Sequence, residues 1–342
     1  YITIIKDYMK GEYMILKAMA GILGLWPFIG FYWGKQKADI FWEEKCKAWS
    51  LPKGIGTTES LTILPLIDWY TKNGELTGEP GVSYLIKTDH NTILFDLGFN
   101  EHNEHPSPLL RNMSKLGISL DDIDTLVISH PHMDHVGGIK NQFKKTFSLS
   151  KEYVDLSDKV IFLPPGMTHP DFNVIQVHRP IRIARGVIST GPIYRSIFLG
   201  GGLFPMGFTP EQALAINVKD KGTVIIVGCG HQGLDRILEL VHQLFNKSIY
   251  GIIGGLHFPV TESRISKLDG KIQGQKLFGT GKLPWDPITK EEVMSQISNL
   301  KSYKPSLVSL SAHDSCDWSI ETFKEEFGPN YRELVVGQKI TI

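Results

Sequence analysis

The sequence predicts an α/β fold, and three observations support this prediction. From about residue 60, apolar runs of strand length alternate with amphipathic segments of helical length. Glycine, proline and asparagine residues separate many of these segments, as they do at turns. Hydrophobic residues make up 42% of the 342-residue chain and charged residues 21%, which is typical of a folded protein with one large domain or two modest ones.

The first predicted elements surround a hairpin. Its two strands are rich in β-branched and aromatic residues, and the chain turns between them at Asp89–Asn91. The helix that follows is amphipathic and ends at Gly117. In this part of the chain we predict strands over 60–68, 82–98 and 123–130, a helix over 107–117, and the start of a helix over 135–143.

The second half of the chain begins with a less regular segment. Residues 150–210 contain many prolines and glycines, which interrupt both strand and helix patterns. After this segment strands and helices alternate again. The predicted elements are strands over 222–228, 249–257 and 305–313, helices over 233–245, 289–300 and 319–328, a looped insertion over 262–288, and a short final strand pair.

The charge balance argues against a nucleic-acid partner. Lys and Arg together number 36, as do Asp and Glu, so the formal net charge is zero, whereas nucleic-acid-binding proteins usually carry a basic excess. The three cysteines form no C-x-x-C pair, so we expect no disulfide framework, and a reducing compartment fits. We therefore expect a small-molecule substrate and no nucleic acid.

One apolar stretch lies near the beginning of the sequence. Residues 18–34 contain no charged side chain, but a membrane-spanning helix needs about 20 apolar residues, so the stretch is short. Pro27 would kink a helix there. Three interpretations remain open: a membrane anchor, a hydrophobic hairpin lying on a membrane, and an arm packed on the domain. Either of the first two would bring residues 14–34 into contact with the membrane.

A linker is predicted near residues 50–60, where the sequence reads SLPKGIGTTES. It divides a hydrophobic N-terminal arm or membrane-associating segment (residues 1–50) from the main domain (residues 51–342). The expected localisation is cytoplasmic or membrane-associated.

A cluster of histidines follows the strand predicted over 123–130. The sequence SHPHMDHVGG places His130, His132, Asp134 and His135 in an H-x-H-x-D-H pattern. His130 and His132 alternate along an extended segment and can point to one side, while the other two reach a second point at the turn. Imidazole and carboxylate bind zinc, iron or manganese, and four such groups suit two neighbouring ions. This spacing makes a merely solvated histidine-rich loop a poor alternative.

The segments SHPHMDHVGG and ILFDLG resemble the signature of the metallo-β-lactamase superfamily. This resemblance, which covers about residues 60–342, implies a four-layer αββα sandwich with two mixed β-sheets and a dinuclear metal site at one edge. It also implies that Asp96 supports the site from behind. The segments TGPIYR, VGCGHQGL and GGLHF resemble the subgroup labelled as dihydropterin or ribofuranosyl-aminobenzene phosphate synthase-like.

Three later histidines each directly follow an apolar predicted strand. They are His231, His257 and His313. In α/β sheets the carboxyl ends of strands form the functional edge, so all three can face the first motif. The resemblance implies that His231 and His313 bind metal and that His257 contacts the substrate.

The sequence also departs from the family pattern. Cys229 occupies the place of the usual bridging aspartate of a GD motif. A thiolate there could bind metal, and a small buried cysteine is equally consistent with the pattern. The subgroup's final His-Cys-Thr-Gly run is replaced by HDSCDW.

The resemblance implies a metal-dependent hydrolase acting on an ester, lactone or phosphodiester. Two divalent ions would activate water. Zinc is the expected metal, with iron or manganese as alternatives. Asp134 would orient the nucleophile, and His257 would protonate the leaving group. The alternatives are a transferase of the subgroup type and a di-iron oxidoreductase, although nothing in the chain resembles the flavin domain of the latter. Arg182, Arg185 and Arg195 cluster near STGPIY. The default interpretation is an exposed basic face, and the alternative is a site for an anionic substrate, since guanidinium suits phosphate or carboxylate.

Overall fold

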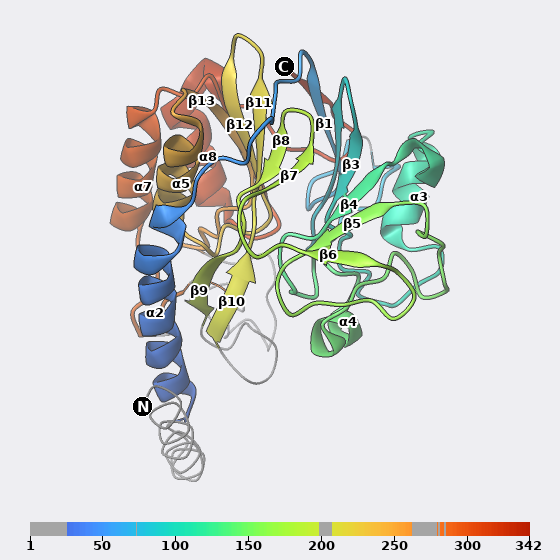
Figure 1. Cartoon of the computed structure of the whole chain (residues 1–342), viewed down its shortest axis with the longest axis horizontal. Helices are drawn as coiled ribbons and strands as arrows, with labels where there is room; N and C mark the ends of the chain where they lie inside the picture. The colour runs from blue at the N-terminus through green and yellow to red at the C-terminus, as the bar shows by residue number, and fades with distance from the viewer. Residues whose placement is uncertain (1–25, 73, 198–206, 262–278, 280, 284) are drawn as a thin grey trace.

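The architecture is known from a computed structural model, which describes residues 26–72, 74–197, 207–261, 279, 281–283 and 285–342. Two β-sheets pack face to face, and helices cover the outer face of each (Figure 1). The predicted four-layer αββα sandwich is therefore confirmed.

The first sheet has seven strands. Their spatial order is β15 (Ile340–Thr341), β1 (Leu61–Ile67), β2 (Ser83–Thr88), β3 (Thr92–Phe95), β4 (Thr125–Val127), β5 (Val160–Leu163) and β6 (Val174–Gln176). The pairs from β15 to β3 are antiparallel, and those from β3 to β6 are parallel. The sheet is mixed, and the predicted hairpin forms its β2–β3 pair.

The second sheet has six strands. Their order is β14 (Leu307–Leu310), β13 (Ile249–Gly254), β12 (Gly222–Val227), β11 (Leu214–Val218), β8 (Val187–Ser189) and β7 (Ile181–Ala184). The strands β12, β13 and β14 are parallel, whereas the remaining pairs are antiparallel. This sheet is also mixed, as predicted.

Three apolar clusters fill the three interfaces between the layers. Residues such as Ile86 and Ile226 join the two sheets. Leu240 and Phe323 belong to the cluster between the second sheet and helices α5 (Leu234–Phe245), α7 (Lys290–Ser302) and α8 (Asp317–Phe327). Met113 on α3 (Pro108–Lys115) belongs to the cluster on the outer face of the first sheet. The described residues also form α4 (Ile139–Lys144) and the short 3₁₀ turns Cys46–Ala48, Leu120–Asp122 and Gly328–Asn330.

Helix α2 (Trp26–Glu44) lies beside a separate two-stranded sheet of β9 (Ile193–Ile197) and β10 (Gly207–Glu211) (Figure 1). Ser196 Oγ donates a hydrogen bond to the carbonyl of Phe31 at 2.7 Å. Trp42 is buried in the cluster that contains α5, and Asp39 forms a 2.6 Å ion pair with Arg236 on that helix. From Trp26 onward, the predicted arm therefore packs on the domain.

The membrane question concerns residues that are only partly described. Residues 1–25 lie outside the described residues, so contact with a membrane through residues 14–34 stays a prediction. The boundary at residue 50 also stays a prediction. Among the helices of the described ranges, none is long and apolar enough to cross a membrane.

The described residues of the segment 150–210 contain more regular structure than the sequence suggested. It contains β5, β6, β7, β8 and β9, which are three to five residues long. Strands of this length contain too few residues for an alternating pattern to emerge between prolines and glycines. Pairing with neighbouring strands therefore decides their conformation.

Candidate metal centre

The histidine loop (residues 130–135) follows β4 in the first sheet, which ends at Val127. Because β3 runs parallel to β4, Asp96 lies beside this loop. Asp96 adopts a φ of 61°, and its carboxylate accepts hydrogen bonds from the backbone nitrogen and the Oγ of Ser129, both at 2.6 Å. Its Oδ2 also lies 2.7 Å from His135 Nδ1. Asp96 thus supports the loop from behind.

The opposite wall of the site comes from the second sheet. The parallel strands β12, β13 and β14 end at one edge, where side chains of a common functional site gather. Cys229 and His231 follow β12, His257 follows β13, and His313 follows β14. The structure brings these strand ends to the histidine loop, since His231 Nε2 lies 3.1 Å from His132 Nδ1.

Hydrogen bonds hold the Nδ1 atoms of four imidazoles, while their Nε2 atoms face the centre. The Nδ1 contacts are His130 with Ser129 Oγ (2.8 Å), His135 with Asp96 (2.7 Å), His231 with the carbonyl of Gly279 (2.7 Å) and His313 with Ser311 Oγ (2.6 Å). The two serine hydroxyls in turn donate to Asp96 and Asp68, each at 2.6 Å. These contacts favour the tautomer with a bare Nε2, which is the form that binds a metal ion.

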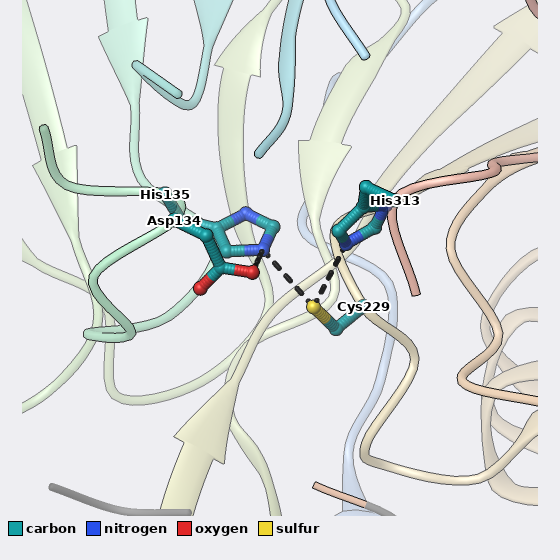
Figure 2. A group of neighbouring side chains, drawn as sticks. All are labelled: Asp134, His135, Cys229 and His313. Atoms are coloured by element: carbon teal, nitrogen blue, oxygen red, sulfur yellow. Dashed lines mark hydrogen bonds and ion pairs between the residues drawn. The ribbon is translucent and has the colours of Figure 1, made fainter. Parts of the chain in front are cut away.

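One group of candidate ligands spans the two walls (Figure 2). Asp134, His135, Cys229 and His313 each offer one donor atom, and these atoms lie within 4.8 Å of one another. Cys229 Sγ is 3.0 Å from His135 Nε2 and 3.1 Å from His313 Nε2. Asp134 Oδ2 lies 3.5 Å from His135 Nε2. Nitrogen, oxygen and sulfur donors at this spacing suit a zinc-like ion.

A second group lies beside the first and consists of His130, Cys229 and His231. His132 adjoins it, because His132 Nδ1 is 3.0 Å from His130 Nε2 as well as close to His231. Within the described part of the chain, the buried His132 Nε2 has no hydrogen-bond partner. Because Nδ1 is the atom that approaches the other two imidazoles, Nδ1 is the candidate donor atom of His132.

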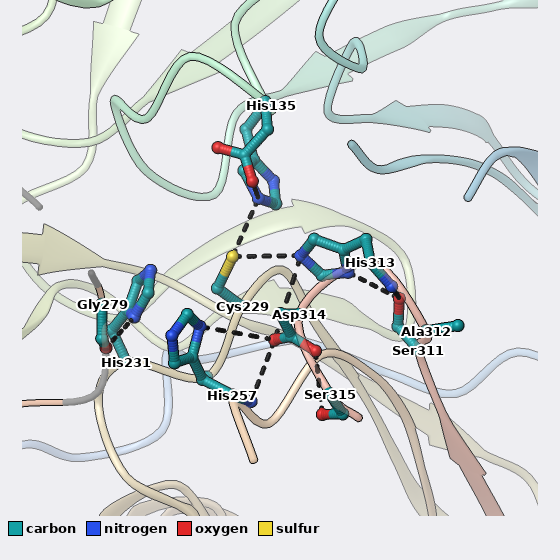
Figure 3. A network of polar contacts seen from close by, with 12 residues as sticks. His135, Cys229, His231, His257, Gly279, Ser311, Ala312, His313, Asp314 and Ser315 are labelled. Carbon is teal, nitrogen blue, oxygen red and sulfur yellow. Dashed lines mark hydrogen bonds and ion pairs between the residues drawn. The ribbon is translucent and has the colours of Figure 1, made fainter. Parts of the chain in front are cut away.

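His257 lies at the edge of the centre, beside His231 (Figure 3). The centroids of the two rings are 4.8 Å apart. The backbone nitrogen of His257 donates to Asp314 Oδ2 at 2.9 Å, and its Nδ1 is 3.9 Å from the same oxygen. His257, Asp314 and Cys229 form a third group of donors. His257 therefore lies directly beside the predicted metal ligands.

Exposure distinguishes two of the predicted site residues from the others. His130, His132, His135, His231 and His313 are all buried, with 7% exposure at most. The side chains of Asp134 and His257 are 23% and 10% exposed. These two residues are the ones to which the sequence assigned catalytic roles.

Burial and neighbouring charges set the ionisation of the donors. Burial lowers the pKa of His132 to about 4 and the pKa values of His130 and His231 well below their usual range. Burial opposes ionisation of both His135 and Asp134. Nevertheless, the nearby Cys229, Asp134 and Asp96 raise the pKa of His135 well above its usual range, and the resulting imidazolium charge holds the pKa of the Asp134 carboxyl below its usual range. His130, His132, His231 and Asp134 thus favour the forms that bind divalent metals, whereas metal binding at His135 would displace a proton from Nε2.

Two buried carboxylates that the sequence analysis did not single out shape the second wall. Glu211, at the end of β10, accepts backbone hydrogen bonds from Cys229 (3.0 Å), Gly230 (2.9 Å) and His231 (2.8 Å). Asp314 holds the backbone of His257. The position of Asp314 directly after His313 was a usable signal for that residue. No local signal identified Glu211, because it follows an irregular segment.

The fold and this donor set resemble those of a known class of metal-binding proteins, the metallo-β-lactamase superfamily. Residues 76–234 match the family described as the metallo-beta-lactamase superfamily. The match includes the histidine loop, Cys229 and His231. Members of the superfamily bind divalent metals, and the buried imidazoles with fixed tautomers fit such ions.

Particular relatives refine this assignment. The chain is 26% identical over 269 residues to the 7,8-dihydropterin-6-methyl-4-(beta-D-ribofuranosyl)-aminobenzene-5'-phosphate synthase of Methanocaldococcus jannaschii, covering 67% of this chain and 87% of that protein. It is 25% identical over 238 residues to the metallo-hydrolase mfmC of Annulohypoxylon moriforme, covering 59% of this chain and 62% of that protein. The sequence resemblance to the synthase-like subgroup is therefore confirmed.

A solved structure confirms the fold. Tm1679, described as a metal-dependent hydrolase of the beta-lactamase superfamily, aligns with a TM-score of 0.55 and 23% sequence identity. The alignment covers 82% of this chain and 98% of Tm1679.

Proposed function

We propose that this protein is a hydrolase with a dinuclear metal centre that acts on an ester, lactone or phosphodiester bond of a small molecule. The observation that carries the proposal is the pair of adjoining donor groups between the two walls. Asp134, His135 and His313 would hold one ion, and His130, His132 and His231 the other. When bound, two divalent ions such as zinc, or alternatively iron or manganese, lower the pKa of water and stabilise developing negative charge.

Asp134 would orient the nucleophile. Its carboxylate is ionised and partly exposed, so it can accept a hydrogen bond from an attacking water while it serves as a ligand. The buried His135, whose Nε2 lies 3.5 Å from Asp134 Oδ2, helps to hold the carboxylate in place.

His257 would donate a proton to the leaving group. Asp314 anchors its backbone, so the ring has a defined position beside His231. Because the ring is partly exposed, it can contact a substrate that reaches the centre. A positioned imidazole is the commonest general acid near neutral pH.

The test combines metal analysis with a substrate panel. Purified protein should contain divalent metal by mass spectrometry and should hydrolyse at least one of three p-nitrophenyl or chromogenic probes: an ester, a lactone or a phosphodiester. Removal of the metal with a chelator should abolish the activity, and zinc, manganese or iron should restore it. Hydrolysis that is unchanged in metal-free protein would contradict the proposal.

The relationship to the methanogen synthase favours a second candidate, group transfer in place of hydrolysis. The two reactions differ in the fate of water. For any substrate consumed, the reaction is run in heavy-oxygen water with and without an aromatic amine acceptor. Hydrolysis places heavy oxygen in the product, whereas transfer yields an amine adduct without it.

A further inference from the structure

We propose that Cys229 is a metal ligand whose thiolate bridges the two metal positions. This inference rests on the proposed dinuclear function, because a bridging ligand requires two ions. Cys229 would be a seventh ligand beside the six predicted from the sequence. It would supply the bridge between the two ions, a role that is assigned to none of those six.

The position of the sulfur carries the inference. Cys229 is the residue shared by all three donor groups of the described chain. Its Sγ lies between His135 Nε2 on the histidine loop and His313 Nε2 after β14, at 3.0 and 3.1 Å (Figures 2 and 3). The same sulfur belongs to the group with His130 and His231. It therefore lies where one group meets the other.

The donors around the sulfur support a ligand role. His135 Nε2 and His313 Nε2 both lie within hydrogen-bonding distance of the same sulfur. Asp134 Oδ2 lies 3.5 Å from His135 Nε2 on the same side of the site. Nitrogen, oxygen and sulfur donors thus converge on one point, as they do around zinc-like ions.

The backbone around Cys229 is held in place. Its amide and the next two amides donate to Glu211, and the residue is 2% exposed. The other cysteines have different surroundings. Cys46 is packed in an apolar cluster with Trp42, and Cys316 Sγ contacts Ser319 Oγ at 3.3 Å. Cys46 therefore offers a matched buried control.

The experiment is cobalt titration of the metal-free full chain, followed by absorption spectroscopy and metal counting. A cobalt–thiolate bond gives a sulfur-to-metal charge-transfer band in the near ultraviolet. We expect this band in the wild type, growing through both cobalt equivalents. C229S should lose the band, and C229D should bind two equivalents without it because a carboxylate can also bridge. C46A should keep the band.

Three outcomes would overturn the inference: two bound equivalents without the band in the wild type, a band that saturates after the first equivalent, or an unchanged band in C229S. Failure of the wild type to bind any cobalt would overturn both this inference and the dinuclear proposal. A normal band in a protein that hydrolyses none of the probes would overturn the proposed hydrolysis alone.

Discussion

The two walls of the metal centre are built in different ways. The histidine loop supplies four candidate ligands within six consecutive residues after β4. The opposite wall collects Cys229, His231, His257 and His313 from the ends of three strands. The first wall is a local motif, whereas the second exists only because β12, β13 and β14 run parallel and end together. In the proposed roles, the loop supplies ligands to both ions through a local motif, whereas the strand ends supply the remaining ligands and the proton donor His257.

Loss of a ligand from the histidine loop should have the largest effect. In His132→Ala we expect metal and activity to disappear together while the fold is retained, because the ring contacts His130 and His231 at the centre rather than the sheet cores. Metal content by mass spectrometry, activity and circular dichroism test this expectation. Exposed His178 provides the control His178→Ala, which should behave as the wild type. Full metal content in the His132 variant would contradict the ligand role of His132.

A smaller effect is expected at the edge of the second wall. His257→Ala should keep nearly full metal occupancy and lower turnover about 10²-fold, the usual contribution of a general acid. The loss should shrink for substrates with good leaving groups, because these depart without a proton. The measurement is the dependence of the turnover rate on the pKa of the leaving group. If His257→Ala empties a metal site and His231→Ala does not, the roles of these two residues are exchanged.

Removal of a residue behind the second wall should weaken metal binding without removing a ligand. Glu211→Ala deletes the acceptor for three consecutive amides, so we expect about tenfold weaker metal binding, at the lower end of typical effects for groups behind a ligand. Glu211→Gln should lose less, since its amide oxygen still accepts. Competition with a chelator of known affinity gives the values. Equal affinities in all three proteins would show that Glu211 does not position Cys229 and His231.

The smallest effect on the centre is expected from the N-terminal arm. Deletion of residues 1–50 should leave metal stoichiometry unchanged, because the contacts described for α2 lie on β9, β10 and α5. Stability should fall, since the buried Trp42 is lost, and Trp42→Ala alone should cost about 3–5 kcal/mol. Thermal melts and metal analysis of both variants test this. Loss of metal in the truncated protein would show that the arm belongs to the domain and that the boundary is wrong.

The same contrast explains what could be predicted from the sequence. The strands and the H-x-H-x-D-H spacing are local patterns, so the sandwich and the four residues of the loop could be inferred from sequence and resemblance. His231, His257 and His313 were identified because each follows a long apolar run. Their distances from the loop depend on strand order, which a single sequence does not encode locally.

Other features had no local signal. The strands β5 to β9 are too short for an alternating pattern, and pairing defines them. Glu211 meets Cys229 and His231 only because the end of β10 lies beside the loop after β12. Such contacts join segments that are far apart in the chain, so residue type and spacing do not reveal them.

The hydrogen bonds that hold Nδ1 of four imidazoles also affect how the protein responds to its supply of metal. Since folding already places these rings, an arriving ion has little to rearrange, and its binding free energy adds to the stability of the folded state. By linkage, free ion at 100 times its dissociation constant stabilises the folded chain by about 2.7 kcal/mol per site. The unfolding temperature should therefore rise with free metal. Inside a cell, metal scarcity would lower the number of folded copies as well as their activity.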